Sequence, residues 1–248
     1  MRENEMGQPI GFAIDDWQGA RAPVHEEIEG ARCRLVPLSA DRHAEALHDA
    51  FAANADGSNW TYLPYGPFAS ASAYSACVRD FERLGAAGDT LFFAIVDGES
   101  ERPIGVSSWL RIAPEPGSIE VGHLCFSPAL QRTPLSTEAM FLMMRRVFED
   151  WGYRRYEWKC DSLNAPSRAA AARLGFRYEG TFRHQTVVKG RNRDTAWFSI
   201  TDLEWPALKA GFEAWLEPAN FDAAGGQKRR LQDFLPETAG RPLAEDVA

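Results

Sequence analysis

The segment of the sequence that most suggests chemistry is a short polar loop that carries Arg132 and leads into a helix start at Thr133-Pro134. Threonine is a good helix cap, and proline at the first helical position loses no hydrogen bond that the helix would otherwise make. The next three amides lie at the positive end of the helix dipole: those of Leu135, Ser136 and Thr137. Beside the guanidinium of Arg132 they could bind an anion, phosphate above all. The alternative is an ordinary strand–turn–helix junction with hydrated amides.

A second segment, 164–182, has the sequence NAPSRAAAARLGFRYEGTF and follows another expected strand. It places an Asn-x-x-Ser helix start before Leu-Gly-Phe and Glu-Gly. Together with the loop at Arg132, this segment resembles the GCN5-related N-acetyltransferase (GNAT) superfamily. Within that superfamily it is most similar to the branch that acetylates ribosomal-protein N-termini. The resemblance runs from about Arg32 to Leu216 and is most specific at 119–138 and 164–180.

The resemblance implies an enzyme that moves an acetyl group from acetyl-CoA to a primary amine by direct attack in a ternary complex. In this family the strand–loop–helix binds the coenzyme. The groups implied for the pyrophosphate are Arg132 and the amides of Leu135, Ser136 and Thr137. Those implied for the pantetheine arm are the amides of Leu124, Cys125 and Phe126 and the side chain of Asn164.

The pyrophosphate loop departs from the family pattern at both of its glycine-type positions. The pattern Gln/Arg-x-x-Gly-x-Gly/Ala maps onto 131–136, where Pro134 and Ser136 stand in place of the small residues. Glycine lets the backbone approach a phosphate closely. The difference therefore bears on coenzyme affinity more than on the identity of the site.

Acetyl transfer needs a neutral amine and a proton for the departing thiolate, so a general base is useful. Glu120 is the candidate base, at the place where histone-acetylating relatives carry a glutamate, and Ser167 matches a serine that can donate to the thiolate in the ribosomal branch. The tyrosine that many relatives use instead corresponds to Ala171. Glu120 could alternatively form a salt bridge on an exposed strand, and Ser167 could merely satisfy first-turn amides.

Other interpretations of these residues stay open. His123 and His184 could act as bases, although an isolated histidine on a strand is more often structural, and Cys125 could act as a nucleophile, although a buried strand cysteine normally behaves as a small hydrophobic residue. A non-catalytic acyl-CoA-binding or partner-binding module that keeps the GNAT fold is the alternative function.

The acceptor side falls on an aromatic, proline-rich loop at 59–68, where the resemblance places the cover of the acceptor cleft. Trp60, Tyr62 and Tyr65 could cage a cationic amine, or they could plug the surface of the sheet. The acceptor could be a protein N-terminus or a small amine. Thr186 stands where some ribosomal acetylases carry an acid, so substrate choice does not carry over from that branch.

These candidate residues require a sheet and helices to position them. Apolar runs and alternation predict strands at 32–38, 91–97, 103–112, 119–126 and 154–161, and two long strands that meet at a turn around Gly190. Helices are expected after Ser39 and at 71–86, 134–151, 164–175 and 205–216. The order predicts a mixed α/β fold. The resemblance implies a mostly antiparallel sheet of about seven strands, split around the cofactor, with helices on both faces. The expected organisation is an N-terminal arm at 1–30, an acetyltransferase domain at 31–216 and a C-terminal tail at 217–248.

Composition limits the partners. The net charge of −8 and a pI of about 5.2 argue against nucleic acid and anionic membranes, which would need a basic face. Four cysteines stand singly, so neither a metal site nor a disulfide is expected. No secretion signal or membrane span is evident, which favours a cytoplasmic protein. Relatives are often dimers, so a homodimer is a further expectation.

Overall fold

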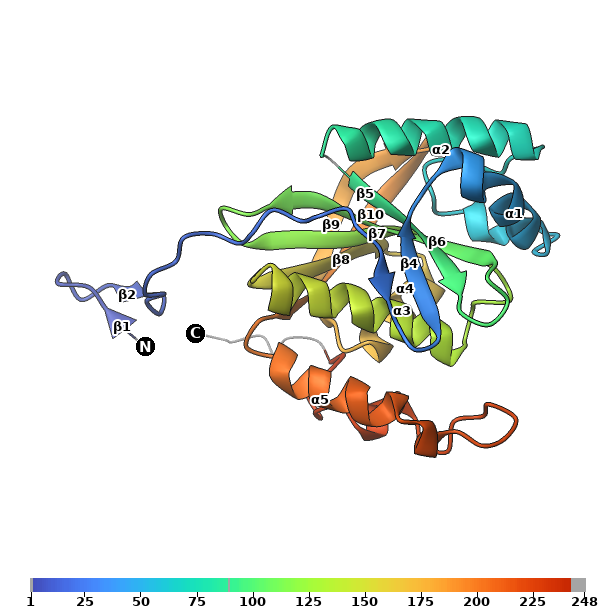
Figure 1. Cartoon of the computed structure of the whole chain (residues 1–248). Helices are drawn as coiled ribbons and strands as arrows, with labels where there is room; N and C mark the ends of the chain where they lie inside the picture. The colour runs from blue at the N-terminus through green and yellow to red at the C-terminus, as the bar shows by residue number, and fades with distance from the viewer. Residues whose placement is uncertain (1, 89, 242–248) are drawn as a thin grey trace.

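The computed structural model describes residues 2–88 and 90–241, which form one central sheet with helices around it (Figure 1). The strands are β3 (Ile28–Glu29), β4 (Cys33–Pro37), β5 (Thr90–Asp97), β6 (Pro103–Ala113), β7 (Ser118–Phe126), β8 (Arg155–Asp161), β9 (Arg177–Val188) and β10 (Arg191–Thr201). Their order in the sheet is β3-β4-β5-β6-β7-β8-β10-β9. All neighbours are antiparallel except β7 and β8, which are parallel.

Helices cover both faces of the sheet. They are α1 (Ala40–Ala52), α2 (Ala71–Ala86), α3 (Pro134–Arg145), α4 (Ala165–Arg173) and α5 (Trp205–Leu216). Figure 1 shows α1 and α2 on one side and α3 and α5 on the other. Adjacent residues of β5 point to opposite faces of the sheet: Phe92 packs with α1 and α2, whereas Phe93 packs with α3. The mixed α/β fold with helices on both faces is therefore confirmed.

The sheet divides between β7 and β8. These strands pair only from Ser118↔Arg155 to Val121↔Trp158. Beyond that point β7 continues along β6, whereas β8 continues along β10. A bulge in β7 coincides with the division, because the register with β6 skips between Cys125 and Gly122. Bulges bend a strand and strengthen its twist, so this one directs β7 away from β8.

Local details differ from the sequence expectations at several helix ends. Ser39 occupies the cap position of α1, but its side chain makes no capping bond; its amide instead donates to Nδ1 of His43 at 3.0 Å. The helix expected at 134–151 is α-helical to Arg145 and then widens into a π-helical turn, Arg146–Asp150. In the N-terminal arm, β1 (Arg2–Glu3) and β2 (Pro9–Ile10) form a small hairpin where no strand was expected.

The segment after α5 packs onto the body of the protein. Leu231 is fully buried, and Asn220 is buried as well. The indole N–H of Trp215 donates to Oε1 of Gln227 and to the carbonyl oxygen of Arg229, each at 3.1 Å. Residues 217–241 therefore extend the hydrophobic core beyond α5. Within the described part of the chain, no helix is long and apolar enough to cross a membrane.

Candidate active site

A cavity of about 680 Å³ opens where β7 and β8 separate. Its walls come from β6 and β7, from the end of β8, from the start of α4 and from the loop that contains the turn Ser58–Trp60. Three hydrogen bonds to backbone carbonyl oxygens hold this loop in place. Lys189 donates to that of Trp60 at 2.8 Å and Arg191 to that of Thr61 at 3.1 Å, while the hydroxyl of Tyr62, in the loop, donates to that of Leu163 at 3.1 Å. The tip of the β9–β10 hairpin and the segment just before α4 thus both hold the loop that lines the cavity.

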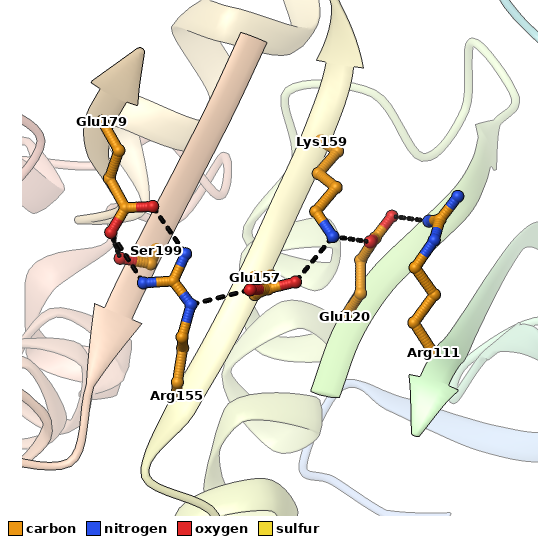
Figure 2. A network of polar contacts seen from close by, with 7 residues as sticks. All are labelled: Arg111, Glu120, Arg155, Glu157, Lys159, Glu179 and Ser199. Atoms are coloured by element: carbon orange, nitrogen blue, oxygen red, sulfur yellow. Dashed lines mark hydrogen bonds and ion pairs between the residues drawn. The ribbon is translucent and has the colours of Figure 1, made fainter. Parts of the chain in front are cut away.

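Glu120 lines this cavity and is buried between two cations (Figure 2). Its Oε1 accepts a hydrogen bond from Arg111 at 2.7 Å, and its Oε2 lies 2.9 Å from Nζ of Lys159. Burial raises the pKa of Glu120, while Lys159 and Arg111 oppose that rise. The salt bridge considered as an alternative to catalysis is therefore present at a position that also faces the cavity.

The charges continue along β8 away from the cavity (Figure 2). Lys159 also contacts Glu157 at 2.7 Å, and Glu157 accepts a hydrogen bond from Arg155 at 2.7 Å. Arg155 in turn donates two bonds to Glu179, at 2.5 and 2.7 Å. Because each carboxylate has a cation on either side or a forked partner, this row of charges holds Glu120 in a fixed position.

Ser167 and Asn164 also line this cavity, at the start of α4. The side chain of Asn164 caps the helix by accepting from the amide of Ser167 at 3.1 Å. Oγ of Ser167 accepts from the indole N–H of Trp158 at 3.0 Å. Since the hydroxyl serves as acceptor in that bond, its own hydrogen can be donated to another group, and the Cys160 side chain lies within hydrogen-bonding reach.

The backbone of β7 alternates between β6 and the open side of the split. The amide of Ser127 donates to Ile104 on the β6 side at 3.1 Å, so Cys125, two residues earlier, also directs its backbone toward β6. Leu124 and Phe126 then face the split. The carbonyl oxygen of Phe126 accepts from Nε2 of Gln131 at 2.8 Å, consistent with this orientation. Of the three residues expected to meet pantetheine, Leu124 and Phe126 direct their backbone toward the split, whereas Cys125 directs its backbone toward β6.

A second cavity, of about 690 Å³, lies at the start of α3 and is lined by Arg132, Thr133, Pro134, Ser136 and Thr137. It adjoins the first cavity, since Gln131, Trp158 and Pro166 line both. Ser136 differs from the expected free donor, because its amide donates to Oγ1 of Thr133 at 3.1 Å and its hydroxyl donates to the carbonyl of Thr133 at 2.7 Å. The threonine cap competes for the amide that sequence reasoning assigned to a phosphate.

Arg173 is a second cation of this cavity that sequence reasoning missed. Its Nη1 donates to Oγ1 of Thr137 at 3.0 Å, and burial lowers its pKa. It stands in the last turn of α4, where a basic residue normally needs no explanation, so no local signal singled it out. Leu135 does not line this cavity, but with Arg132 exposed on the loop at the start of α3 and Arg173 beside Thr137, the second cavity still suits an anionic group.

The aromatic loop does not form the expected cage. Trp60 is only 7% exposed and packs edge-on against Phe51 and Phe68, with ring centroids 5.4 and 5.3 Å apart. Tyr65 stacks on His123 at 5.6 Å. Both rings belong to the core under α1 and α2, where large apolar surfaces gain most from burial. Of the three expected acceptor-side aromatics, Tyr62 lines the cavity.

The other candidate chemical groups near the cavity are held in neutral forms. Burial lowers the pKa of His123 to about 4, with Arg111 and Arg193 adding to the effect, so the imidazole is neutral at pH 7. Burial raises the pKa of Cys125 to about 12, which leaves an unreactive thiol. His184 does not line either cavity.

Known proteins resemble this chain in both sequence and structure. The model of the acetyltransferase (GNAT) domain family matches residues 32–177. The structure of a GCN5-related N-acetyltransferase from Brucella melitensis is 44% identical over 89% of this chain and 99% of that one, with a TM-score of 0.85. A probable acetyltransferase of the GNAT family from Chromobacterium violaceum is 42% identical over 81% and 98%, with a TM-score of 0.73. No curated protein matches the chain.

The ribosomal branch is a more distant likeness than the sequence motifs suggested. RimL, a ribosomal L7/L12 alpha-N-protein acetyltransferase, is 20% identical over 71% of this chain and 94% of its own, with a TM-score of 0.62. At that identity the likeness concerns the fold alone.

Proposed function

The chain belongs to the GNAT acetyltransferase family, and from that premise we propose that it moves an acetyl group from acetyl-CoA to a primary amine on a protein N-terminus or a small molecule. The amine attacks directly while both substrates are bound. A covalent route through Cys125 is disfavoured by the burial that raises the pKa of its thiol. The observation that carries the proposal is that Glu120 and Ser167 line one cavity, with the anion-suited cavity at Arg132 directly beside it.

The residues at the second cavity fit the anionic end of the coenzyme. Arg132 supplies a full charge, the start of α3 supplies the positive end of a helix dipole, and Arg173 adds a second cation. At the split, the backbone groups of Leu124 and Phe126 are directed away from β6 and suit an extended amide-containing chain. Asn164 and Tyr62 complete the wall that such a chain would meet.

Two protons must be moved in the reaction. The coenzyme thioester supplies the activated acetyl group. Glu120 takes the proton that the amine loses on attack, directly or through one water molecule, because its carboxylate is the buried base of the cavity. Ser167 offers its hydroxyl hydrogen to the departing thiolate, since its oxygen already accepts the indole N–H of Trp158. Lys159 and Arg111 hold Glu120 in place throughout.

The test is release of coenzyme thiol by the full chain, with acetyl-CoA offered against a panel of small amines and a panel of peptides with free N-termini. We expect thiol release with at least one acceptor and covalent acetylation of that acceptor by mass spectrometry. Binding of acetyl-CoA without thiol release on any amine would contradict the enzymatic proposal.

A further inference from the structure

The acceptor cavity carries a cation that lacks a counter-ion. Arg193, on β10, lines the cavity with Glu120. Among residues 2–88 and 90–241, no side chain forms a hydrogen bond or ion pair with its guanidinium, and its Nε is buried without a partner. Two neighbouring carboxylates have other partners: Asp194, the next residue, accepts from the amide of His184 at 2.7 Å, and Asp161, on the adjacent strand β8, accepts from that of Leu163 at 2.9 Å.

Arg193 is half-buried, and its buried Nε–H is costly to leave unpaired, because a donor that gives up water needs an acceptor in return. Arg111 and Lys159, the other cations of the cavity, both have Glu120 as a partner. Lys159 has Glu157 as a second partner, so among the described lining residues Arg193 is the cation left without a carboxylate partner.

The cavity that Arg193 lines also has an unpaired acceptor. Asn59 lines the cavity, and its Nδ2 lies 3.8 Å from Sγ of Cys125 while its Oδ1 is buried without a partner. An amine N–H could donate to that oxygen. A purely cationic acceptor would meet the unpaired charge of Arg193, and neither Trp60 nor Tyr65 is free to cage it.

We propose that the acceptor is an amine whose own molecule carries a carboxylate, and that Arg193 binds this carboxylate in the cavity. The inference rests on the proposed acetyl transfer. Besides its amine, the acceptor must carry one anionic group that can reach the planar guanidinium of Arg193, which can donate two parallel hydrogen bonds. A free amino acid and a peptide with an acidic residue beside its N-terminus share this chemistry.

The experiment compares acceptors that differ in one charge. Free amino acids are paired with their C-terminal amides, and peptides with Asp at the second position are paired with the same peptides with Asn. Thiol release is expressed as kcat/KM per concentration of neutral amine, so that differences in amine pKa do not enter. We expect the carboxylate member of the responding pair to be about ten- to a hundredfold better, the usual range for one charged hydrogen bond. The pair that responds identifies the source of the carboxylate.

Variants assign the effect to one residue. R193Q should lose this preference, and R193K should keep part of it because the charge remains. R183Q is the matched control: Arg183 is exposed on the paired strand β9, does not line the cavity and should keep the full preference. No preference in the wild type, or a preference that survives R193Q, would overturn the inference.

A binding measurement separates this inference from the enzymatic proposal. Titration calorimetry of N-acetylated amino acids and their amides on the full chain needs no turnover. Tighter binding of the carboxylate form that disappears in R193Q would support the inference even if no amine released thiol. Equal binding of the two forms would overturn it even if acetyl transfer were observed.

Discussion

Glu120 and Lys159 form a buried ion pair across β7 and β8, with 2.9 Å between Oε2 and Nζ, next to the last paired residues of the two strands. The pair thus lies at the point where the sheet divides. Removing one partner of a buried ion pair is costly, because the charge of the other partner is left uncompensated. The same contact therefore anchors the division of the sheet and positions the proposed base.

The first prediction concerns Glu120→Gln. Glutamine keeps the size and can accept hydrogen bonds but cannot take a proton, so we expect kcat to fall by roughly a hundredfold or more. Coenzyme affinity, measured by calorimetry, should change little because the second cavity is untouched. Glu45→Gln is the control, since Glu45 is exposed on α1. An unchanged kcat would exclude Glu120 as the base.

The second prediction is the pH dependence of kcat/KM. Burial raises the pKa of Glu120, against the opposing effect of Lys159 and Arg111. Glu120 therefore becomes protonated at a higher pH than an ordinary glutamate, whose pKa is about 4.3. The protonated form cannot accept a proton, and the rate should therefore fall as pH decreases through this raised value. Kinetics from pH 8 to pH 4.5 would measure this decrease, with kcat/KM expressed per concentration of neutral amine so that protonation of the acceptor does not enter. A rate that stays flat over this range would contradict the prediction.

The third prediction concerns acid stability. Burial acts to raise the pKa of Glu179, but hydrogen bonds from Arg155 and Ser199 outweigh it, so that the pKa is lowered on folding. A carboxyl whose folded pKa is lowered stabilises the fold above its unfolded pKa, about 4.3, and loses that contribution as pH falls through the folded value. Thermal unfolding of Glu179→Gln should show a smaller drop in Tm between pH 7 and pH 3 than the wild type. Glu99→Gln, at an exposed turn, is the control and should show the same drop in Tm as the wild type.

The fourth prediction concerns Arg132→Ala. Removing the exposed cation at the start of α3 should weaken coenzyme binding by about tenfold at low salt, and by less as salt is added. Calorimetry at two salt concentrations measures both effects. Arg83→Ala, at the far end of α2, changes the net charge equally and serves as the control. Equal affinities for wild type and Arg132→Ala would remove the pyrophosphate assignment.

The fifth prediction tests the segment after α5. Leu231 is fully buried, so Leu231→Ala should lower the free energy of unfolding by about 2–5 kcal/mol. Leu203→Ala removes the same atoms from a side chain that is 76% exposed and should cost less than about 0.5 kcal/mol. Urea unfolding of both variants gives the comparison. Similar small losses would mean that the segment does not contribute to the core.

The sequence predicted those parts of the fold that depend on local patterns. The helix expected at 71–86 matches α2, because Ser70 accepts a capping bond from the amide of Ala73 and buried residues recur on one face. The strands β5 to β7 are similarly apparent as apolar runs. The methionines of α3 lie in the core, at the spacing of a buried helix face.

The remainder depends on contacts between residues far apart in the chain. Nothing near Glu120 in the sequence indicates that Arg111 and Lys159, from the two neighbouring strands, would pair with it. Leu231 follows a Gly-Gly segment typical of a loose tail, and only its packing in the folded chain reveals a core residue. Trp60 looked like a binding residue because an aromatic ring in a loop has no periodicity that would mark it as buried.

The attachment of the loop at 59–64 has a consequence for how acceptor preference could diversify. Lys189 and Arg191 hold this loop by the carbonyl oxygens of Trp60 and Thr61, atoms that every amino acid possesses. Exchange of the side chain at Thr61 therefore leaves both anchors intact while altering the surface that faces an incoming amine. Selectivity and folding are partly uncoupled at this position, which makes it a suitable starting point for directed evolution toward new acceptors.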